Sequence, residues 1–261
     1  MYSLVSCVEG GWTPLSAEGR FMGASAWGDM ERTTNAYYPI LRQAITLQEN
    51  GEDFVTTLRV HLLIESCHNW LRIGNAIGFS KVNAEFLSTN SGFYRYTHPY
   101  RGELQKVMGA SIAIETLWNP DNVVDPDRVE HAEITQQRLD KAAALQLVFE
   151  DSLFHMIGVL LRKYKVPRMV FVGGTALNCI ATKKVLQACD AKFCQRHGVQ
   201  LGGAQTCTID GKEHNVGLQL WIPPACSDTG VPLGAALTAA MQITGKSIRI
   251  ILQSHSCLKQ L

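Results

Sequence analysis

The sequence predicts an α/β protein, because short apolar strands break at glycine or proline and restart as helices. One such strand–turn–helix corner covers residues 170–179, VFVGGTALNC, and a second covers residues 218–236, LQLWIPPACSDTGVPLGAA. A long amphipathic pattern over residues 134–164 precedes both corners. Strands that alternate with helical patterns are typical of α/β architecture.

The first corner turns at Gly173 and Gly174. Glycine lets a backbone approach a ligand closely, and the start of the following helix directs N–H groups and partial positive charge at the turn. Such a corner is suited to phosphate or nucleotide, although many strand–glycine–helix turns serve packing alone. The motif by itself therefore does not distinguish a phosphate site from a packing turn.

The second corner stops its strand at Pro223-Pro224 and places Asp228 just before a helix of small residues. Aspartate at this position is commonly an N-cap. The alternative is a carboxylate that handles a metal ion or phosphate, because hard cations are held by oxygen ligands. Both interpretations stay open at this point.

The clearest helix is expected from about Ile134 to Tyr164. Its apolar residues recur at three- and four-residue spacing, and its end carries the basic residues Arg162, Lys163 and Lys165 ahead of Pro167. Cations near a helix carboxyl end and a proline beyond it are the usual stop signals.

The region ahead of this helix is less regular. Residues 35–50 and 54–75 are expected to be helical or mixed, and residues 78–109 are expected to form a loop. A loop of this kind either shapes a pocket for an acceptor substrate or is an ordinary connector. Turns are expected at 119–121 and 125–127, where proline stands beside aspartate.

Composition excludes several function classes. The formal net charge of +1 over 261 residues gives no electrostatic reason to expect nucleic acid or an anionic membrane as a partner. No apolar run approaches a membrane span and no secretory signal is evident, so a cytoplasmic location is expected. The eight cysteines form no C-x-x-C pair, which argues for buried thiols rather than zinc or disulfides.

Two further segments complete a family resemblance. Residues 17–29 read AEGRFMGASAWGD and residues 131–134 read HAEI. Together with GGTALNC and LWIPPACSDTGVPLGAAL, these ordered motifs resemble the O-carbamoyltransferases of nodulation-factor, cephamycin, ansamycin, aminoglycoside and saxitoxin biosynthesis. The family pattern runs close to EGKxMGLAxYG, HADIA, GGVALN, and a strand ending in PP before GDxGxALGAA.

The resemblance implies an actin and hexokinase type of fold, with two ribonuclease-H-like lobes that close on a nucleotide. Family members use ATP and carbamoyl phosphate to make carbamoyl-adenylate, and pass the carbamoyl group to a hydroxyl of a sugar or natural product. A bivalent metal, Fe(II) in the best-described relative, is held by two histidines and an aspartate. Asp228 matches that aspartate.

The remaining site residues follow from the same resemblance. Gly173, Gly174, Thr175, Ala176 and Asn178 would line the adenosine and phosphate pocket. Asn178 has a second interpretation, because an asparagine one turn into a helix can bridge backbone groups instead. Arg20 stands where the family has lysine and would contact phosphate, although arginine presents a planar fork and lysine a point charge.

Several departures bear on how the chain is interpreted. The family histidines belong to an HxxxH segment that this sequence lacks, and His61 and His68 are not assigned to the role. Glu133 replaces the aspartate of HADIA, which lengthens the side chain. The segment from Gln187 to Leu218 is longer than the family connection. It is expected to be an inserted loop or a reading error. Either one would change the position of Gly174 relative to Asp228.

The resulting hypothesis is a partial O-carbamoyltransferase. Residues 1–244 would be the latter part of the actin-like domain, residues 245–261 an atypical tail, and the carboxyl-terminal adenylate-forming domain would be absent. Carbamoyl transfer would be incomplete in this chain alone, and no acceptor-activating base is named. The alternatives are a non-catalytic nucleotide-binding fragment, or another actin-like protein such as a kinase or a threonylcarbamoyltransferase acting on tRNA.

Overall fold

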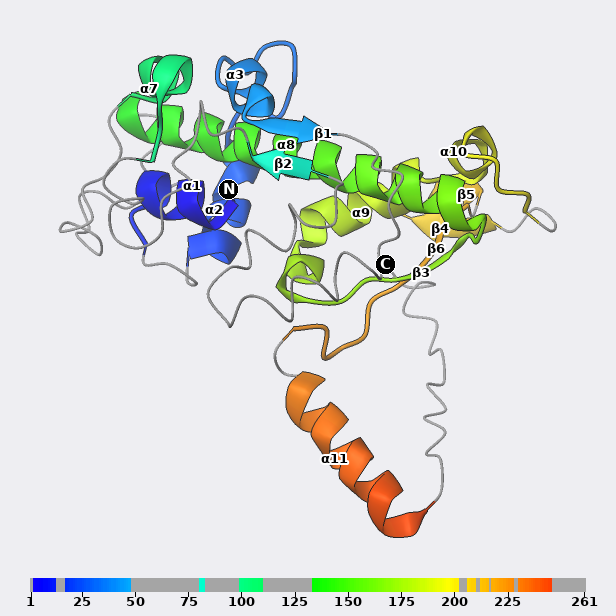
Figure 1. The fold of residues 1–261 in the computed structure, drawn as a ribbon. Helices are drawn as coiled ribbons and strands as arrows, with labels where there is room; N and C mark the ends of the chain where they lie inside the picture. The colour runs from blue at the N-terminus through cyan, green and yellow to red at the C-terminus, as the bar shows by residue number, and fades with distance from the viewer. Residues whose placement is uncertain are drawn as a thin grey trace. The chain divides into compact units, whose positions relative to one another are not determined.

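A computed structural model of the chain describes residues 2–12, 17–47, 80–82, 99–109, 133–201, 206–209, 212–215, 217–227 and 230–245. These residues form a mixed α/β structure that is mostly helical and contains small two-stranded sheets (Figure 1). The chain divides into two compact units, residues 1–156 and residues 157–261, and each is described by itself.

The first unit is built from short helices around the first part of a long helix. Its elements are α1 (Tyr2–Gly10), α2 (Ala17–Ala24), the 3₁₀ turn η1 (Ser25–Trp27), α3 (Tyr38–Gln43) and α7 (Gly102–Met108). Strands β1 (Ile45–Leu47) and β2 (Ser80–Val82) pair antiparallel. The core gathers large apolar side chains from α1, α2, α3, α7 and the long helix, among them Val5, Phe21, Leu41, Leu104 and Leu145.

The long helix α8 spans Glu133–Tyr164 and confirms the predicted one. Seven apolar residues between positions 139 and 148 have no exposed surface: Leu139, Ala142, Ala143, Ala144, Leu145, Leu147 and Val148. Lys165 follows in a left-handed conformation with φ 57°, and its N–H donates to the carbonyl of Leu161. Pro167 then prevents further helix.

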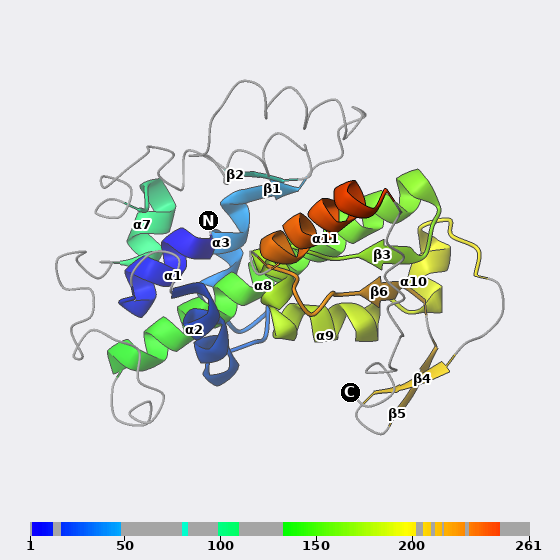
Figure 2. The ribbon, with the colours of Figure 1, turned by 90° about the horizontal axis from the view of Figure 1, so that it is seen from below.

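The second unit contains the two predicted corners. Strand β3 (Arg168–Val170) pairs in parallel with β6 (Gln219–Trp221), with Met169 opposite Leu220 (Figures 1 and 2). Between them lie the 3₁₀ turn η5 (Gly174–Leu177), α9 (Cys179–Ala188), α10 (Ala191–Arg196) and the hairpin of β4 (Thr206–Ile209) and β5 (Lys212–Asn215). Helix α11 (Gly230–Thr244) follows β6.

Residues 35–47 are mixed, as one of the two expectations had it: α3 is followed by strand β1. The loop expected at 78–109 was wrong in part, because Ser80–Val82 form a strand that pairs with residues 45–47. Helix α7 also lies in that expected loop, where Leu104 and Met108 pack into the core on one face. Residues 48–50, 54–75 and 83–98, with the turns at 119–127, lie outside the described residues.

The expected inserted loop, residues 187–218, carries regular structure where it is described. Asp190 begins α10 by accepting a hydrogen bond from the N–H of Phe193 at 2.8 Å. The N–H of Leu218 then donates to the carbonyl of Cys189 at 2.8 Å, which closes the base of the segment. The two ends of this segment are therefore hydrogen-bonded to each other, which allows β6 to pair with β3.

One helix among the described residues is long and apolar enough to cross a membrane, the Gln136–Tyr164 part of α8. The most apolar window of this segment is 61% buried inside the structure. The core helix of a globular domain passes the same test of length and composition, so this finding is weak support for a membrane span.

Candidate functional site

The two strand–turn–helix corners meet at one edge of the β3–β6 sheet. Parallel strands end at the same edge, so the chain leaves β3 and β6 side by side. The N–H of Phe171 donates to the carbonyl of Trp221 at 3.0 Å, and one step further the N–H of Gly173 donates to the carbonyl of Cys226. The glycine turn of the first corner is thus hydrogen-bonded to the loop of the second.

Gly173 adopts a backbone conformation that side chains rarely allow. Its φ is 93° and its ψ is 171°, a region populated essentially by glycine. Gly174 differs in its backbone, because its φ is not in the positive region; a Cβ placed on either glycine would meet nothing within 4 Å. Packing within the described structure therefore does not require glycine at position 174, and the space beside its backbone is open.

A 3₁₀ turn separates the glycine pair from α9, whereas the sequence predicted a helix directly after the glycines. The carbonyl of Gly173 accepts from the N–H of Ala176, and the carbonyl of Thr175 accepts from the N–H of Asn178. Helix α9 begins only at Cys179, because Asn178 caps it: Oδ1 of Asn178 accepts from the N–H of Ala181 at 3.0 Å. The N–H groups of Gly174 and Thr175 open the 3₁₀ turn and have no partner inside it.

Exposure differs among the predicted nucleotide-binding residues. Gly173, Gly174 and Thr175 are exposed, Ala176 is buried, and Asn178 is 8% exposed. The cap role of Asn178 is the second interpretation that the sequence left open. These five residues lie within one turn, so the structure brings them together.

The predicted metal ligand Asp228 and the residue His131 lie outside the described residues. On one side of Asp228, Cys226 is buried and the carbonyl of Ser227 accepts from the N–H of Gly230 at 2.9 Å. Within the described ranges there is no group of three or more His, Cys, Asp or Glu side chains that could hold a metal ion. The described residues by themselves therefore supply no ligand set for Fe(II).

Arg20, the predicted phosphate contact, belongs to the other unit. It lies on the exposed side of α2, with its guanidinium carbon 5.9 Å from the centre of the Trp12 ring. The motif it belongs to is anchored to α8: the N–H of Asp29 donates to Oδ1 of Asp140 at 2.9 Å, and a Cβ on Gly28 would lie 2.1 Å from the carbonyl oxygen of Leu139. The end of this motif therefore has a packing role, which its sequence did not reveal.

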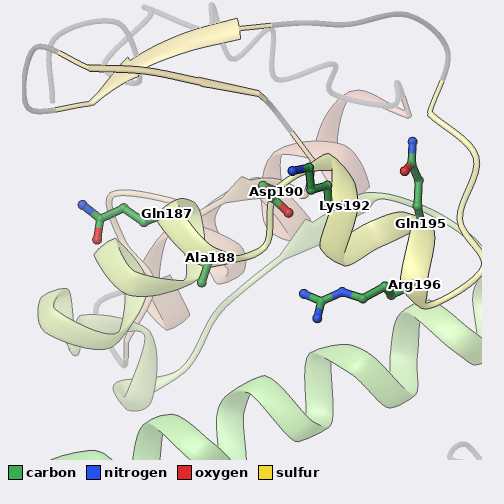
Figure 3. A pocket seen from close by; sticks show the side chains of 6 residues that line it. All are labelled: Gln187, Ala188, Asp190, Lys192, Gln195 and Arg196. Carbon is green, nitrogen blue, oxygen red and sulfur yellow. The ribbon is translucent and has the colours of Figure 1, made fainter. Parts of the chain in front are cut away.

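A shallow cavity of about 750 Å³ lies at the other end of α9 (Figure 3). It is lined by Gln187, Ala188, Asp190, Lys192, Gln195 and Arg196. Helix α9 has 10 residues, so its two ends are about 15 Å apart and the cavity is separate from the glycine corner. Asp190 caps α10, and Lys192 and Arg196 lie four residues apart on that helix. This pattern is visible in the sequence and could have indicated the surface.

Sequence reasoning also missed a buried charge cluster in the first unit. Nζ of Lys141 donates to Oε2 of Glu9 at 2.9 Å and to the carbonyl of Met108 at 2.6 Å. The hydroxyl of Tyr100 donates to Oε1 of Glu9 at 2.7 Å. Burial raises the pKa of Glu9, and Lys141 and Tyr100 oppose that rise. The side chains of Glu9 and Lys141 are almost inaccessible, and each partner offsets the desolvation of the other.

Comparison with known proteins finds a similarity over part of the chain. No protein-family model matches the chain. Part of the chain is similar to "Uncharacterized protein sll1178" of Synechocystis sp. (strain ATCC 27184 / PCC 6803 / Kazusa), with 27% identity over 113 residues. The match covers 43% of this chain and 14% of the length of that protein.

Proposed function

We propose that the chain carries part of the nucleotide-binding lobe of an O-carbamoyltransferase with an actin-like fold. The observation that supports this proposal best is the meeting of the two motif-bearing corners, where Gly173 is hydrogen-bonded to Cys226. Actin-like and related α/β proteins bind ligands beyond the carboxyl ends of parallel strands, which is where both turns lie.

The proposed ligand is ATP or carbamoyl-adenylate. The open space beside Gly174 would admit a phosphate group, and the N–H groups of Gly174 and Thr175 at the start of the 3₁₀ turn would donate to its oxygens. Thr175 would add a hydroxyl donor. Ala176 and Asn178 would support the turn from behind, since both are buried and Asn178 caps α9.

The complete reaction transfers a carbamoyl group from carbamoyl-adenylate to a hydroxyl of a small natural product or sugar. In that reaction the corner residues of this chain would bind and orient the donor, while carbamoyl phosphate and the acceptor are handled by other segments. Arg20 would contribute a phosphate contact. The role of Asp228 as an Fe(II) ligand, with two histidines from elsewhere, and a cytoplasmic location remain parts of the same proposal.

Isothermal calorimetry with carbamoyl-adenylate, and with ATP in parallel, tests the proposed site. The variant Gly174→Val would place its Cβ in a space with no described atom within 4 Å and would narrow the site, so we expect it to lose binding while its circular dichroism stays unchanged. Lys192→Ala in the α9–α10 cavity is the matched control and should bind as the wild-type chain does. Binding that survives in Gly174→Val and disappears in Lys192→Ala would place the nucleotide in the cavity and overturn the assignment.

The metal assignment has its own test. Calorimetric titration of ferrous iron into the chain, with and without Asp228→Ala, measures whether that carboxylate takes part in metal binding. Equal iron affinity in both chains would remove Asp228 from the proposed ligand set. The nucleotide experiment does not depend on this result.

A further inference from the structure

Helix α11 has the composition of a buried helix, yet no described part of the chain buries any of its residues. Its 15 residues contain no charged side chain. Four of its large apolar side chains are prominently exposed: Val231 at 70%, Leu233 at 53%, Met241 at 44% and Ile243 at 85%. A helix that is apolar on all sides is normally covered on most of them.

Two of the three polar side chains of α11, those of Thr238 and Thr244, are hydrogen-bonded within the helix; Gln242 is the third. Oγ1 of Thr238 donates to the carbonyl of Gly234 at 2.8 Å, and Oγ1 of Thr244 donates to the carbonyl of Ala240 at 2.7 Å. These are bonds of a hydroxyl to the carbonyl four residues earlier. Covering the helix with apolar surface would therefore cost little desolvation of polar groups.

One face of the β3–β6 sheet in the same unit is exposed; it is polar at the start of the strands, where Arg168 pairs with Gln219, and apolar at their carboxyl end. Val170 of β3 and Trp221 of β6 are directly paired neighbours, and they are 61% and 39% exposed. Val172, just beyond β3, is 56% exposed, whereas Leu220, whose side chain points to the other face, is buried. Parallel strands are normally covered on both faces, and among the described residues no element buries this face of the sheet.

We propose that α11 covers the Val170–Trp221 face of the β3–β6 sheet in its own chain. Leu233, Leu237 and Met241 recur every four residues and form the stripe that would contact the sheet. Eight residues, 222–229, link the end of β6 to the start of α11. The linker is held at the carboxyl edge of the sheet, because the carbonyl of Cys226 accepts from the N–H of Gly173, so α11 starts a few residues from the face it would cover.

The short covalent link between β6 and α11 favours α11, rather than a second copy of the chain or a lipid bilayer, as the cover of this sheet face. A tethered helix faces the sheet at an effective concentration of roughly millimolar, which a second copy in solution rarely reaches. A lipid bilayer is a poor match, because a helix of 15 residues is about 22 Å long and the hydrocarbon core is about 30 Å thick. Consecutive elements also tend to be adjacent in space.

Hydrogen exchange measured by mass spectrometry on the full chain tests this packing. An isolated helix of this length is marginal, so unpacked α11 amides should exchange rapidly. We expect protection in residues 236–244 of the wild-type chain, and exchange at least about tenfold faster in Val170→Asp and in Leu233→Asp. Leu233 lies in the first turn, where a carboxylate favours a helix, so faster exchange in that variant reports lost packing.

The controls separate packing from unfolding and from self-association. Val107→Asp, at an exposed apolar position of α7, should leave α11 exchange unchanged. Retained protection of α9 in the two test variants shows that the unit is folded, and Leu233→Asp carries the test if Val170→Asp does not fold. Rapid exchange of wild-type α11, or protection that disappears on dilution as a second copy would produce, overturns the proposal.

Discussion

The N–H of Gly173 donates to the carbonyl of Cys226, and this hydrogen bond joins two turns that are far apart in the sequence. It lies one step beyond the bond between Phe171 and Trp221, so it extends the β3–β6 ladder into the loops. The glycine conformation at 173, with φ 93°, allows the turn to make this bond. The candidate nucleotide site therefore depends on the pairing of two strands.

A pair of glycine substitutions should separate packing from helix propensity in the first unit. Gly28→Ala puts a Cβ 2.1 Å from the carbonyl oxygen of Leu139, so the loop must shift from α8 and we expect a loss of about 1–3 kcal/mol. Gly19→Ala, inside α2, meets nothing within 4 Å and should gain up to about 1 kcal/mol. Urea unfolding of both variants checks this, and equal stabilities would contradict the close approach of Gly28 to α8.

Removing Lys141 should destabilise the first unit strongly. Lys141→Met leaves the buried Glu9 carboxylate without its cation, and we expect a loss of about 3–5 kcal/mol in the free energy of unfolding. The double variant Glu9→Gln with Lys141→Met removes both charges and should recover part of that loss. If the double variant loses as much free energy of unfolding as Glu9→Gln and Lys141→Met lose together, the two side chains do not interact.

Tyr100 should make the protein sensitive to alkaline pH. Burial raises the pKa of Tyr100 well above 10.0, with further contributions from the Glu9 charge and the hydrogen bond to it. The unfolded chain releases this proton near pH 10 while the folded chain keeps it, so stability falls as pH rises past 10, by up to about 1.4 kcal/mol per pH unit.

The variant Tyr100→Phe isolates that contribution. At about pH 8 it should lose about 1 kcal/mol, because one hydrogen bond to Glu9 is removed. Above pH 10 its stability should fall less steeply than that of the wild-type chain, although Tyr2, whose pKa burial also raises, still contributes. Parallel pH profiles of unfolding free energy for the two chains would contradict the assignment.

Asn178 should act on stability through its cap. Asn178→Ala removes the acceptor for the N–H of Ala181, and we expect a loss of about 1 kcal/mol in thermal or urea unfolding. Asn178→Asp keeps an oxygen acceptor and should remain close to the wild-type stability. If nucleotide affinity drops in Asn178→Asp while stability holds, the side chain also contacts the ligand; a stable Asn178→Ala would refute the cap.

Local chemistry made some elements readable from sequence. The periodic apolar residues of α8 and the cations and proline at its end predicted a helix from 134, and the structure has Glu133–Tyr164. The sequence predicted a buried strand over 170–172 ahead of the glycine pair; the structure has the turn at the glycines, but the strand is 168–170, and Val170 and Val172 are 61% and 56% exposed. A backbone bridge by Asn178 was one of two predicted roles, and the structure places that bridge at the start of α9 rather than one turn inside a helix. The family resemblance and its ligands remain predictions.

Tertiary pairing decided the rest, because it joins residues that sequence patterns treat separately. Residues 45–47 are a strand through their partner Ser80–Val82, and β3 meets β6 only after the chain closes at Leu218 and Cys189. Lys141 reads as a solvent-exposed cation of an amphipathic helix, yet it is 5% exposed because α1 supplies Glu9. By itself the sequence determined the elements whose signals lie within a few residues; long-range hydrogen bonds and burial determined which of those elements came together.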